Sequence, residues 1–150
     1  MELVRVNSSN WEKAAELTTN EDGIPTLYEK FIAGNACSIL ESIYEKGWQS
    51  FIIEENNTPV GFTMFGFNEK EGFYEICRLM IDFRHQGRGL GRKALRLIIK
   101  KMCEEFSPKE IYISSEKENE RAIALYKSEG FLDTGLLLSG EKLLRLKSSI

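Results

Sequence analysis

The clearest candidate for chemistry is a glycine-rich segment in the middle of the chain, which consists of Gln86, Gly87, Arg88, Gly89, Leu90 and Gly91. It follows a strand-like run, Phe73–Phe83, and precedes a helical pattern, Leu90–Phe106. Glycine lets the backbone approach a ligand closely, because it has no Cβ and adopts positive φ readily. Amides at a helix start lie at the positive end of the helix dipole and favour an anion. The segment therefore predicts a phosphate site, and Arg92, one turn into the helix, is a further candidate ligand.

The spacing of the glycines excludes the commoner phosphate loops. A Walker loop needs G-x-x-x-x-G-K-[ST], and a dinucleotide fingerprint needs G-x-G-x-x-G at the opening of a domain. The segment has neither pattern. It instead resembles Q/R-x-x-G-x-G/A, the acyl-CoA pyrophosphate loop of the GNAT N-acetyltransferase superfamily, with Gln86, Gly89 and Gly91 at its defined positions.

A second motif lies about thirty residues downstream and reads N-x-x-A-x-x-x-Y-x-x-x-G-F from Asn119 to Phe131. Its offsets place Asn119, Ala122 and Tyr126 on one helix face. Taken alone, the pattern favours an N-capping asparagine and a partly buried core tyrosine. Together with the glycine segment it resembles the GNAT motif for the pantetheine and thiol end of CoA, and this resemblance covers roughly Val60–Leu146.

The resemblance implies a GNAT fold, an α/β (α+β) architecture whose mixed central sheet of about six to seven strands is flanked by helices and splayed to hold acyl-CoA. The length favours a single domain over residues 1–150. Acetyl-CoA is the implied cosubstrate. Its expected ligands lie at the end of the central strand, in the glycine segment and at the start of the second motif: Leu79, Met80, Ile81, Gln86, Gly87, Arg88, Gly89, Leu90, Gly91, Arg92 and Asn119.

Acetyl transfer from a thioester to an amine needs a neutral amine, a stabilised oxyanion and a proton for the leaving thiolate. An alkylammonium of pKa ~10.4 is only about one part in a thousand neutral near pH 7.4, so a carboxylate is needed as a base. Glu75 lies eleven residues before Gln86, the spacing of the catalytic glutamate in histone-type members. It is the candidate base, with a solvated glutamate near a strand start as the equal alternative.

The other two catalytic groups come from the motif positions. Tyr126 is the candidate general acid, because a phenol can protonate a leaving thiolate. A backbone N–H near Leu79–Ile81 is expected to hold the oxyanion. No covalent intermediate is needed, since Cys77 has no identifiable histidine or basic partner to activate it. His85, the only histidine, is expected to pack or to form a hydrogen bond.

The first third of the chain offers acidic and aromatic side chains to a cationic acceptor: Glu16, Glu21, Asp22, Tyr28, Glu29, Phe31 and Trp48. Such a mixture suits a small polycation through ion pairs and cation–π contacts. The overall pattern resembles the bacterial spermidine/spermine (diamine) acetyltransferases, so the predicted acceptor is a small-molecule amine, best a di- or polyamine. Acetylation of protein lysines or N-termini is the alternative, as is a non-catalytic acyl-CoA-binding regulatory module.

Composition limits the partners and the compartment. The net charge is −3, from 20 basic and 23 acidic side chains, which argues mildly against a nucleic-acid partner. No apolar run approaches the ~20 residues of a membrane span, and the N-terminus lacks the regions of a signal peptide. Three widely spaced cysteines and one histidine make a disulfide framework or a metal site improbable. We therefore expect a cytoplasmic, metal-free protein, with a homodimer left open.

Periodicity predicts the remaining elements. Strands are expected over Glu2–Val6, Gln49–Glu54, Val60–Phe67, Phe73–Phe83 and Ile111–Ile113, with a closing hairpin of Leu136–Leu138 and Leu143–Leu146. Helices are expected at Leu27–Phe31, Ile39–Tyr44, Leu90–Phe106 and Asn119–Ser128. A capping box that starts at Ser9 predicts a further short helix toward Leu17.

Overall fold

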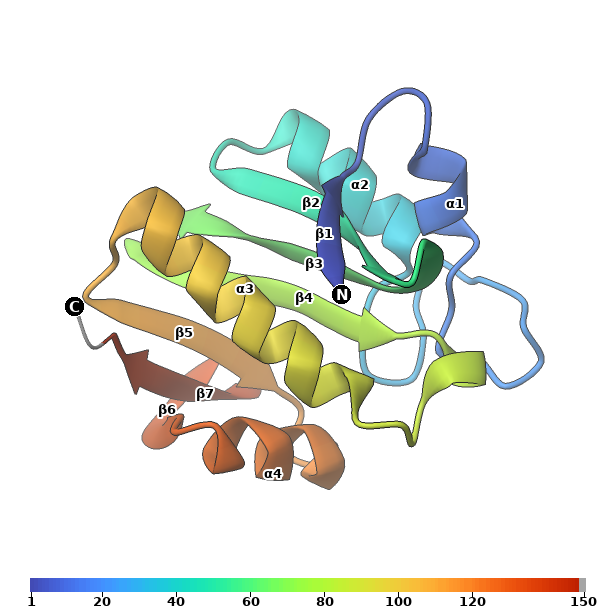
Figure 1. The fold of residues 1–150 in the computed structure, drawn as a ribbon. Helices are drawn as coiled ribbons and strands as arrows, with labels where there is room; N and C mark the ends of the chain where they lie inside the picture. The colour runs from blue at the N-terminus through green and yellow to red at the C-terminus, as the bar shows by residue number, and fades with distance from the viewer. Residues whose placement is uncertain (149–150) are drawn as a thin grey trace.

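Seven strands form one mixed sheet in the order β1-β2-β3-β4-β5-β7-β6, shown in Figure 1. The computed structural model describes residues 1–148. The strands are β1 (Glu2–Arg5), β2 (Trp48–Glu55), β3 (Thr58–Asn68), β4 (Phe73–Ile81), β5 (Glu110–Ser115), β6 (Leu132–Leu138) and β7 (Glu141–Lys147). The helices are α1 (Trp11–Ala15), α2 (Asn35–Tyr44), α3 (Leu90–Phe106) and α4 (Glu120–Ser128), with a 3-10 turn at Phe83–His85. The predicted sheet of six to seven strands is confirmed.

The hairpin between β2 and β3 shows how local sequence sets the register. Asn56 and Asn57 both have positive φ, 51° and 60°. Two successive left-handed residues give the tight turn whose twist suits an antiparallel pair. The predicted strands Gln49–Glu54 and Val60–Phe67 are therefore confirmed, each slightly longer than expected.

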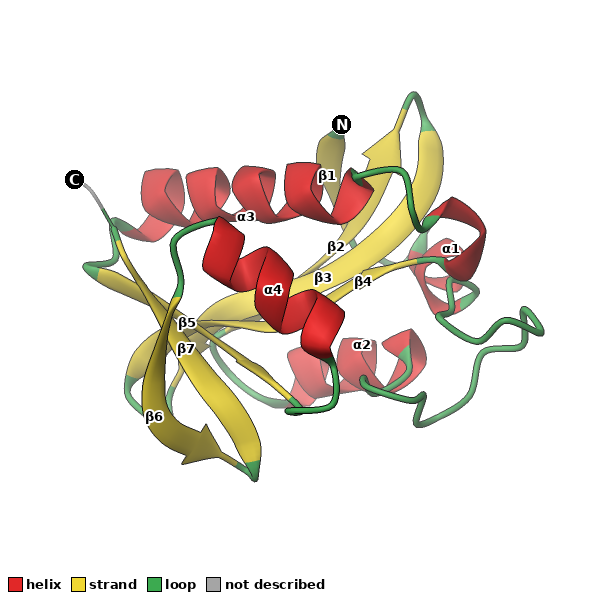
Figure 2. Ribbon diagram, turned by 90° about the horizontal axis from the view of Figure 1, so that it is seen from below, coloured by secondary structure: helices red, strands yellow, loops and turns green. Residues whose placement is uncertain are grey.

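The sheet opens between β4 and β5, which are its only parallel neighbours among the described strands. Only three residue pairs join them, from Tyr74–Ile111 to Ile76–Ile113. Beyond Ile76, β4 stays paired with β3 while β5 leaves with β7. Figure 2 shows the two halves of the sheet diverging, with α3 and α4 on one face and α2 on the other. The predicted splay is thus present, and it opens toward the start of α3.

A β-bulge in β4 lies at this opening. Ile76 pairs with Phe65 and Arg78 pairs with Met64, so Cys77 is an extra residue without a partner on β3. A bulge interrupts the alternation of side chains between the two faces. Cys77 packs in the cluster beneath α2, and Arg78 also turns toward α2. Two successive side chains consequently face the same side of the sheet.

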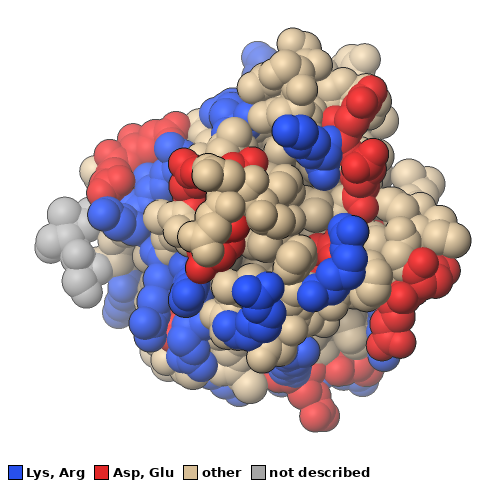
Figure 3. Space-filling view, turned by 45° about the vertical axis from the view of Figure 1, so that its right-hand side comes forward, with Lys and Arg blue, Asp and Glu red and all other residues tan. Residues whose placement is uncertain are grey.

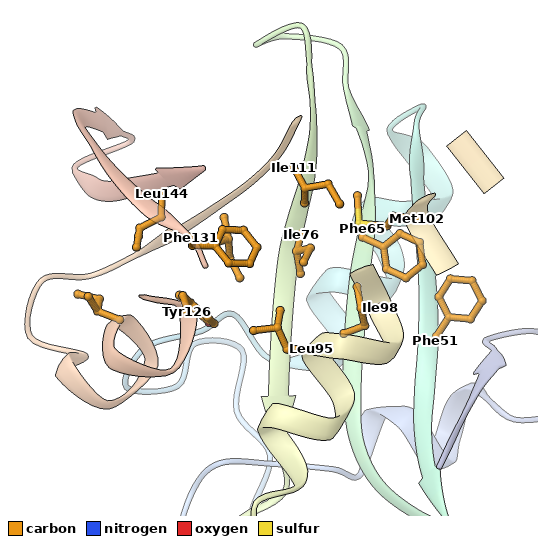
Figure 4. Close-up of a cluster of buried hydrophobic side chains, with 12 residues drawn as sticks. Phe51, Phe65, Ile76, Leu95, Ile98, Met102, Ile111, Tyr126, Phe131 and Leu144 are labelled. Atoms are coloured by element: carbon orange, nitrogen blue, oxygen red, sulfur yellow. The ribbon is translucent and has the colours of Figure 1, made fainter. Parts of the chain in front are cut away.

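The main core lies between the sheet and α3, as Figure 4 shows for its largest members. The predicted apolar stripe of α3 is confirmed, because Leu90, Ala94, Ile98 and Met102 are all buried. Burial of a side chain such as Ile98 contributes roughly 1.5–3 kcal/mol. A second cluster covers the opposite face beneath α1 and α2. The main cluster fixes α3, and therefore the glycine segment before it, against β4.

Two predictions in the first third are wrong. The segment predicted as a helix, Leu27–Phe31, is irregular and contains an isolated bridge from Tyr28 to Ala33. Its apolar run is too short to nucleate a helix, and the Gly34 N–H donates to Leu27 O (2.8 Å) instead. The chain there folds back on itself.

The predicted capping box is also wrong. Ser9 donates to the Asn7 side chain (2.8 Å from its N–H, 2.7 Å from Oγ), so it does not cap α1. Asn10 occupies the N-cap position, without a side-chain capping bond. The helix ends at Ala15, two residues short of the predicted Leu17. Among the other elements, β4 ends at Ile81 rather than at Phe83.

Candidate active site

The glycine segment forms a loop that returns to the end of β4. The side chain of Gln86 donates from Nε2 to Ile81 O (3.0 Å). Gly87 and Gly89 have φ of 77° and 72°, and a Cβ at either would meet no protein atom within 4 Å. Gly89 is the N-cap of α3. The space beside these two glycines is open to a ligand, as the sequence predicts for a phosphate loop.

The loop also has hydrogen-bond donors to offer. Within residues 1–148, no backbone hydrogen bond uses the amides of Gln86 through Arg92; the first amide bonded to the chain is that of Lys93, which donates to Gly89 O (3.4 Å). Unbonded amides at the start of a seventeen-residue helix form an anion site, because they point outward along the positive end of the helix dipole. The residues present therefore fit a pyrophosphate.

Arginine side chains surround this loop, but they already have partners. Arg88 Nη1 lies 3.2 Å from His85 Nδ1, which gives the histidine the hydrogen-bonding role expected of it. Arg92 Nη1 contacts Glu129 on α4 at 2.5 Å, and Arg96 shares the same carboxylate. For Arg92 to bind a phosphate, the phosphate would have to replace the Glu129 carboxylate as its partner. Figure 3, turned toward the side of the loop, shows Lys and Arg side chains gathered at the lower centre of this face.

Backbone N–H groups at the end of β4 face the opening. Asp82 donates from its amide to Val60 O on β3 (2.9 Å). In an antiparallel ladder, alternate residues bond to the same neighbour, so Met80 also faces β3. The intervening amides of Leu79 and Ile81 point away from β3 into the gap toward β5. These are the groups predicted to hold an oxyanion.

Tyr126 extends from α4 into the core beside Phe131, with ring centroids 6.1 Å apart. Only 7% of the residue is exposed. Burial raises the pKa of its phenol well above the ordinary value, and the Glu141 carboxylate adds to the rise. No hydrogen bond of the hydroxyl occurs within residues 1–148. The phenol therefore keeps its proton at neutral pH and is able to donate it.

Asn119 caps α4, as the sequence alone suggests. Its Oδ1 accepts from the Ala122 N–H (3.4 Å). The helix ends at Ser128, and Gly130 follows the C-cap residue with a φ of 96°, which favours glycine. The motif thus sets both ends of the helix and holds Tyr126 in its last turn. Any contact of Asn119 with a ligand would be additional to this capping.

Glu75 is buried on β4, with 3% of the residue exposed. Burial raises the pKa of its carboxyl, against the opposing effects of a 2.7 Å hydrogen bond from Asn68 Nδ2 and the charge of Arg78. The alternative of a solvated glutamate is therefore wrong. A buried carboxylate with a raised pKa suits a general base, because it takes up a proton more readily. Its neighbour on β5 is Tyr112.

The bulge residues form a bridge to α2. Arg78 donates from Nη2 to Glu41 (3.1 Å), from Nε to Ser38 Oγ (3.2 Å) and from Nη1 to Cys77 Sγ (2.8 Å). Burial raises the pKa of the Cys77 thiol to about 12. A thiol with this pKa is not a nucleophile at neutral pH. The expectation that Cys77 has no basic partner is wrong, because Arg78 contacts its sulfur, but the raised pKa of the thiol still disfavours an acyl-carrying role.

Some residues expected to serve the acceptor have structural roles. Trp48 is buried in the cluster beneath α2. Glu29 accepts hydrogen bonds from Thr18 and Thr19, including 2.7 Å from the Thr19 N–H. Tyr28 is largely exposed. Only some of the predicted acidic and aromatic side chains are therefore free to contact an acceptor.

Comparison with known proteins identifies the fold and the family. A profile described as the acetyltransferase (GNAT) family matches residues 12–131, which is most of the chain. The chain belongs to this family. The spermidine N-acetyltransferase of Vibrio cholerae, solved in complex with CoA and spermine, has a TM-score of 0.70 at 19% identity, with 96% of this chain and 92% of that chain covered. This likeness shows that the fold is shared.

Curated relatives match over part of their length. The spermine/spermidine N(1)-acetyltransferase of Bacillus subtilis is 39% identical over 92 residues, which cover 57% of this chain and 60% of the relative. The N-alpha-acetyltransferase RimI of Mycobacterium tuberculosis is 36% identical over 64 residues, covering 42% of this chain and 37% of the relative. The matched region thus spans about 60% or less of these relatives.

The structure adds site residues that sequence reasoning missed. Glu141 at the start of β7 and Asn68 at the end of β3 both act on Glu75. Ser114 on β5 donates to Glu141 (2.6 Å). None of these residues belongs to a family motif. Asn68 reaches Glu75 across the β3–β4 hairpin, whereas Ser114 and Glu141 are brought to the site by strand pairing across a long sequence separation. Local patterns carry no signal for such contacts.

Proposed function

We propose that this protein is an acetyl-CoA-dependent N-acetyltransferase whose acceptor is a small di- or polyamine. The observation that carries the proposal is the opening between β4 and β5, bordered by the donor-rich loop. The buried base candidate Glu75 and the buried phenol of Tyr126 both lie within electrostatic range of one carboxylate, Glu141. An anion site, a base and an acid are thereby assigned to one opening in the sheet.

The bound cosubstrate supplies an acetyl thioester. The amides of residues 86–92 fit its pyrophosphate, and the gap beside Leu79 and Ile81 fits its pantetheine arm. The N–H groups of these two residues face the gap, so they are the donors for the oxyanion that forms during acyl transfer. A hydrogen bond from a rigid strand costs little reorganisation, which is why we assign the role to the backbone.

Glu75 and Tyr126 handle the protons. An ammonium group must lose a proton before its nitrogen can attack, and the Glu75 carboxylate accepts it directly or through a water. Tyr126 donates its phenolic proton to the departing sulfur. The raised pKa of the Tyr126 phenol makes this donation uphill on its own, so it requires a shared hydrogen bond with the developing thiolate.

Several features support an amine acceptor of small size. The Bacillus subtilis relative is a spermine/spermidine acetyltransferase by name, and the Vibrio cholerae structure contains spermine. Acidic groups at the site favour a cation. The RimI relative favours a protein N-terminus as the second candidate. The three cysteines are free thiols, which supports a reducing compartment, and none of the described helices is long and apolar enough to cross a membrane.

Acetyl-CoA turnover against a panel of amines tests the proposal. Thiol release should be fastest with spermidine, spermine and short diamines, slower with monoamines, and slowest with lysine-containing peptides or peptides with a free N-terminus. Protein without an amine gives the background hydrolysis rate. Turnover restricted to peptides would replace the polyamine acceptor by a protein, and binding of CoA without any turnover would favour a regulatory module.

Replacement of Glu75 by glutamine should produce a loss of turnover that depends on pH. Glutamine keeps the size and can still accept from Asn68, but it cannot take a proton. We expect kcat/KM to fall about 10²–10⁴-fold near neutral pH and to recover in part at high pH, where more of the amine is already neutral. The measurement is a pH profile of both proteins with one diamine. An equal loss at every pH would assign Glu75 to substrate positioning.

The same substitution should also stabilise the fold. The pKa of Glu75 is higher in the folded state than in the unfolded state, so the folded protein binds more protons between these two pKa values. Stability from this group is therefore present at low pH and is lost as pH rises through that interval. Glu75→Gln should raise Tm at neutral pH and leave it unchanged below the ordinary carboxyl pKa. A lower Tm at neutral pH would contradict the assigned shift.

A further inference from the structure

Glu141 lies where the two halves of the sheet separate. It is the first residue of β7, and its Oε2 accepts a 2.6 Å hydrogen bond from Ser114 Oγ on β5. Tyr112, two residues before Ser114, pairs with Glu75 on β4. Residues two apart on a strand face the same side, so Ser114 and its partner Glu141 share a face with Glu75. This face is the one that Arg78 and α2 occupy.

The charge of Glu141 acts on both proton-handling groups. Burial is the largest cause of the raised pKa of Tyr126, and Glu141 is the one charged group of the described chain that contributes to it. For Glu75, burial is again the largest cause, and Glu141 adds a smaller rise in the pKa. The Glu141 carboxylate therefore lies within electrostatic range of both Glu75 and Tyr126.

Two carboxylates at this place have no cation of their own. Neither Glu75 nor Glu141 forms an ion pair within residues 1–148. Arg78, the basic side chain whose charge acts on Glu75, is engaged by Glu41 on α2 (3.1 Å). Two carboxylates without an ion pair present negative charge to a ligand. A ligand with two positive charges can pair with both carboxylates, whereas a ligand with one can pair with only one of them.

We propose that Glu141 binds the ammonium group of the acceptor that is not acetylated, and thereby selects di- and polyamines over monoamines. This inference rests on the proposed N-acetyltransferase function and names a residue that determines its specificity. Glu75 takes the proton from the reacting nitrogen, and Glu141 holds the second nitrogen. Ser114 is a positioning residue, since its hydroxyl fixes the carboxylate of Glu141.

The test compares a diamine with a monoamine of equal chain length, diaminopropane and propylamine, in the full-length protein. Glu141→Gln keeps the hydrogen bond from Ser114 and removes the charge. Loss of one hydrogen bond to a charged group should lower kcat/KM for diaminopropane about 10- to 100-fold, mainly through KM. The loss for propylamine should be much smaller, because this amine has no second ammonium group and responds only to the change of charge near Glu75 and Tyr126, and the KM of acetyl-CoA should not change. Ser114→Ala should also lower kcat/KM for diaminopropane, by a smaller factor.

The matched control is Glu104→Gln, which changes the net charge equally at an exposed position on α3 and should leave both amines unaffected. Calorimetric titration of each amine into the CoA-bound protein gives the same comparison without turnover. Equal losses for both amines would overturn the inference and show that Glu141 acts through Tyr126 rather than on a second ammonium group. Undiminished use of diaminopropane by Glu141→Gln would overturn the inference alone. Wild-type protein that acetylates no amine would overturn the proposed function, and the inference with it.

Discussion

Replacement of Tyr126 by phenylalanine is expected to lower kcat about 10²–10⁴-fold while leaving the affinity for acetyl-CoA unchanged. The substitution removes only the hydroxyl, and the ring continues to pack beside Phe131. No hydrogen bond of the hydroxyl within residues 1–148 is lost. Tm should therefore be little changed. Steady-state kinetics with a saturating diamine and calorimetry with acetyl-CoA separate the two effects.

Tyr74→Phe is the control for Tyr126→Phe. Tyr74 is a partly buried tyrosine in the same core, stacked on Phe106 with ring centroids 5.1 Å apart, and it lies on β4 outside the opening. The Tyr74→Phe protein should have the same kcat as the wild type. Wild-type kcat in Tyr126→Phe would show that the tyrosine only packs and that water supplies the proton. A parallel loss of acetyl-CoA affinity would make its role one of binding.

Gly89→Val should lower the affinity for acetyl-CoA by at least about 10²-fold, because loss of even one or two hydrogen bonds to a charged group is worth that much. At φ of 72° a branched side chain is strained by about 1–3 kcal/mol. The added atoms also enter the open space beside the loop where a phosphate would lie. Calorimetry with CoA measures the loss.

Gly72→Val separates strain from binding. Gly72 lies in the turn between β3 and β4, has φ of 78°, and has no atom within 4 Å of an added Cβ. The two variants should lose similar amounts of stability, but only Gly89→Val should lose CoA affinity. Unchanged CoA affinity in a folded Gly89→Val protein would exclude this loop as the pyrophosphate site.

The sequence predicts best where one periodic pattern coincides with one element. The helix Leu90–Phe106 has the predicted bounds, because its apolar stripe is long and its start is marked by glycines. Asn119 and Gly130 likewise mark the ends of α4. These two elements carry the motif residues, so the positions of those residues in the fold could be predicted from sequence, while their contacts with CoA stay predictions.

Features that depend on contacts between distant segments could not be predicted. The irregular loop before α2 is held by Glu29 and the two threonines at 18 and 19, which a five-residue apolar pattern does not reveal. The bulge at Cys77 appears only when β4 is aligned with β3. Glu141 reaches the site because β7 inserts between β5 and β6. The acceptor side of the site is built largely from such contacts.

The short seam between β4 and β5 also governs how the protein withstands unfolding. Three residue pairs join a four-stranded half of the sheet to a three-stranded half, and the inner strand edges beyond the seam carry unpaired backbone groups that attract other strands. In the proposed complex, a CoA molecule in the gap would replace the missing partners and link the two halves. At a hundredfold excess over its Kd, a ligand adds about 2.7 kcal/mol of stability. Excess acetyl-CoA is therefore expected to hold the two halves together and to protect the inner strand edges from association with other strands.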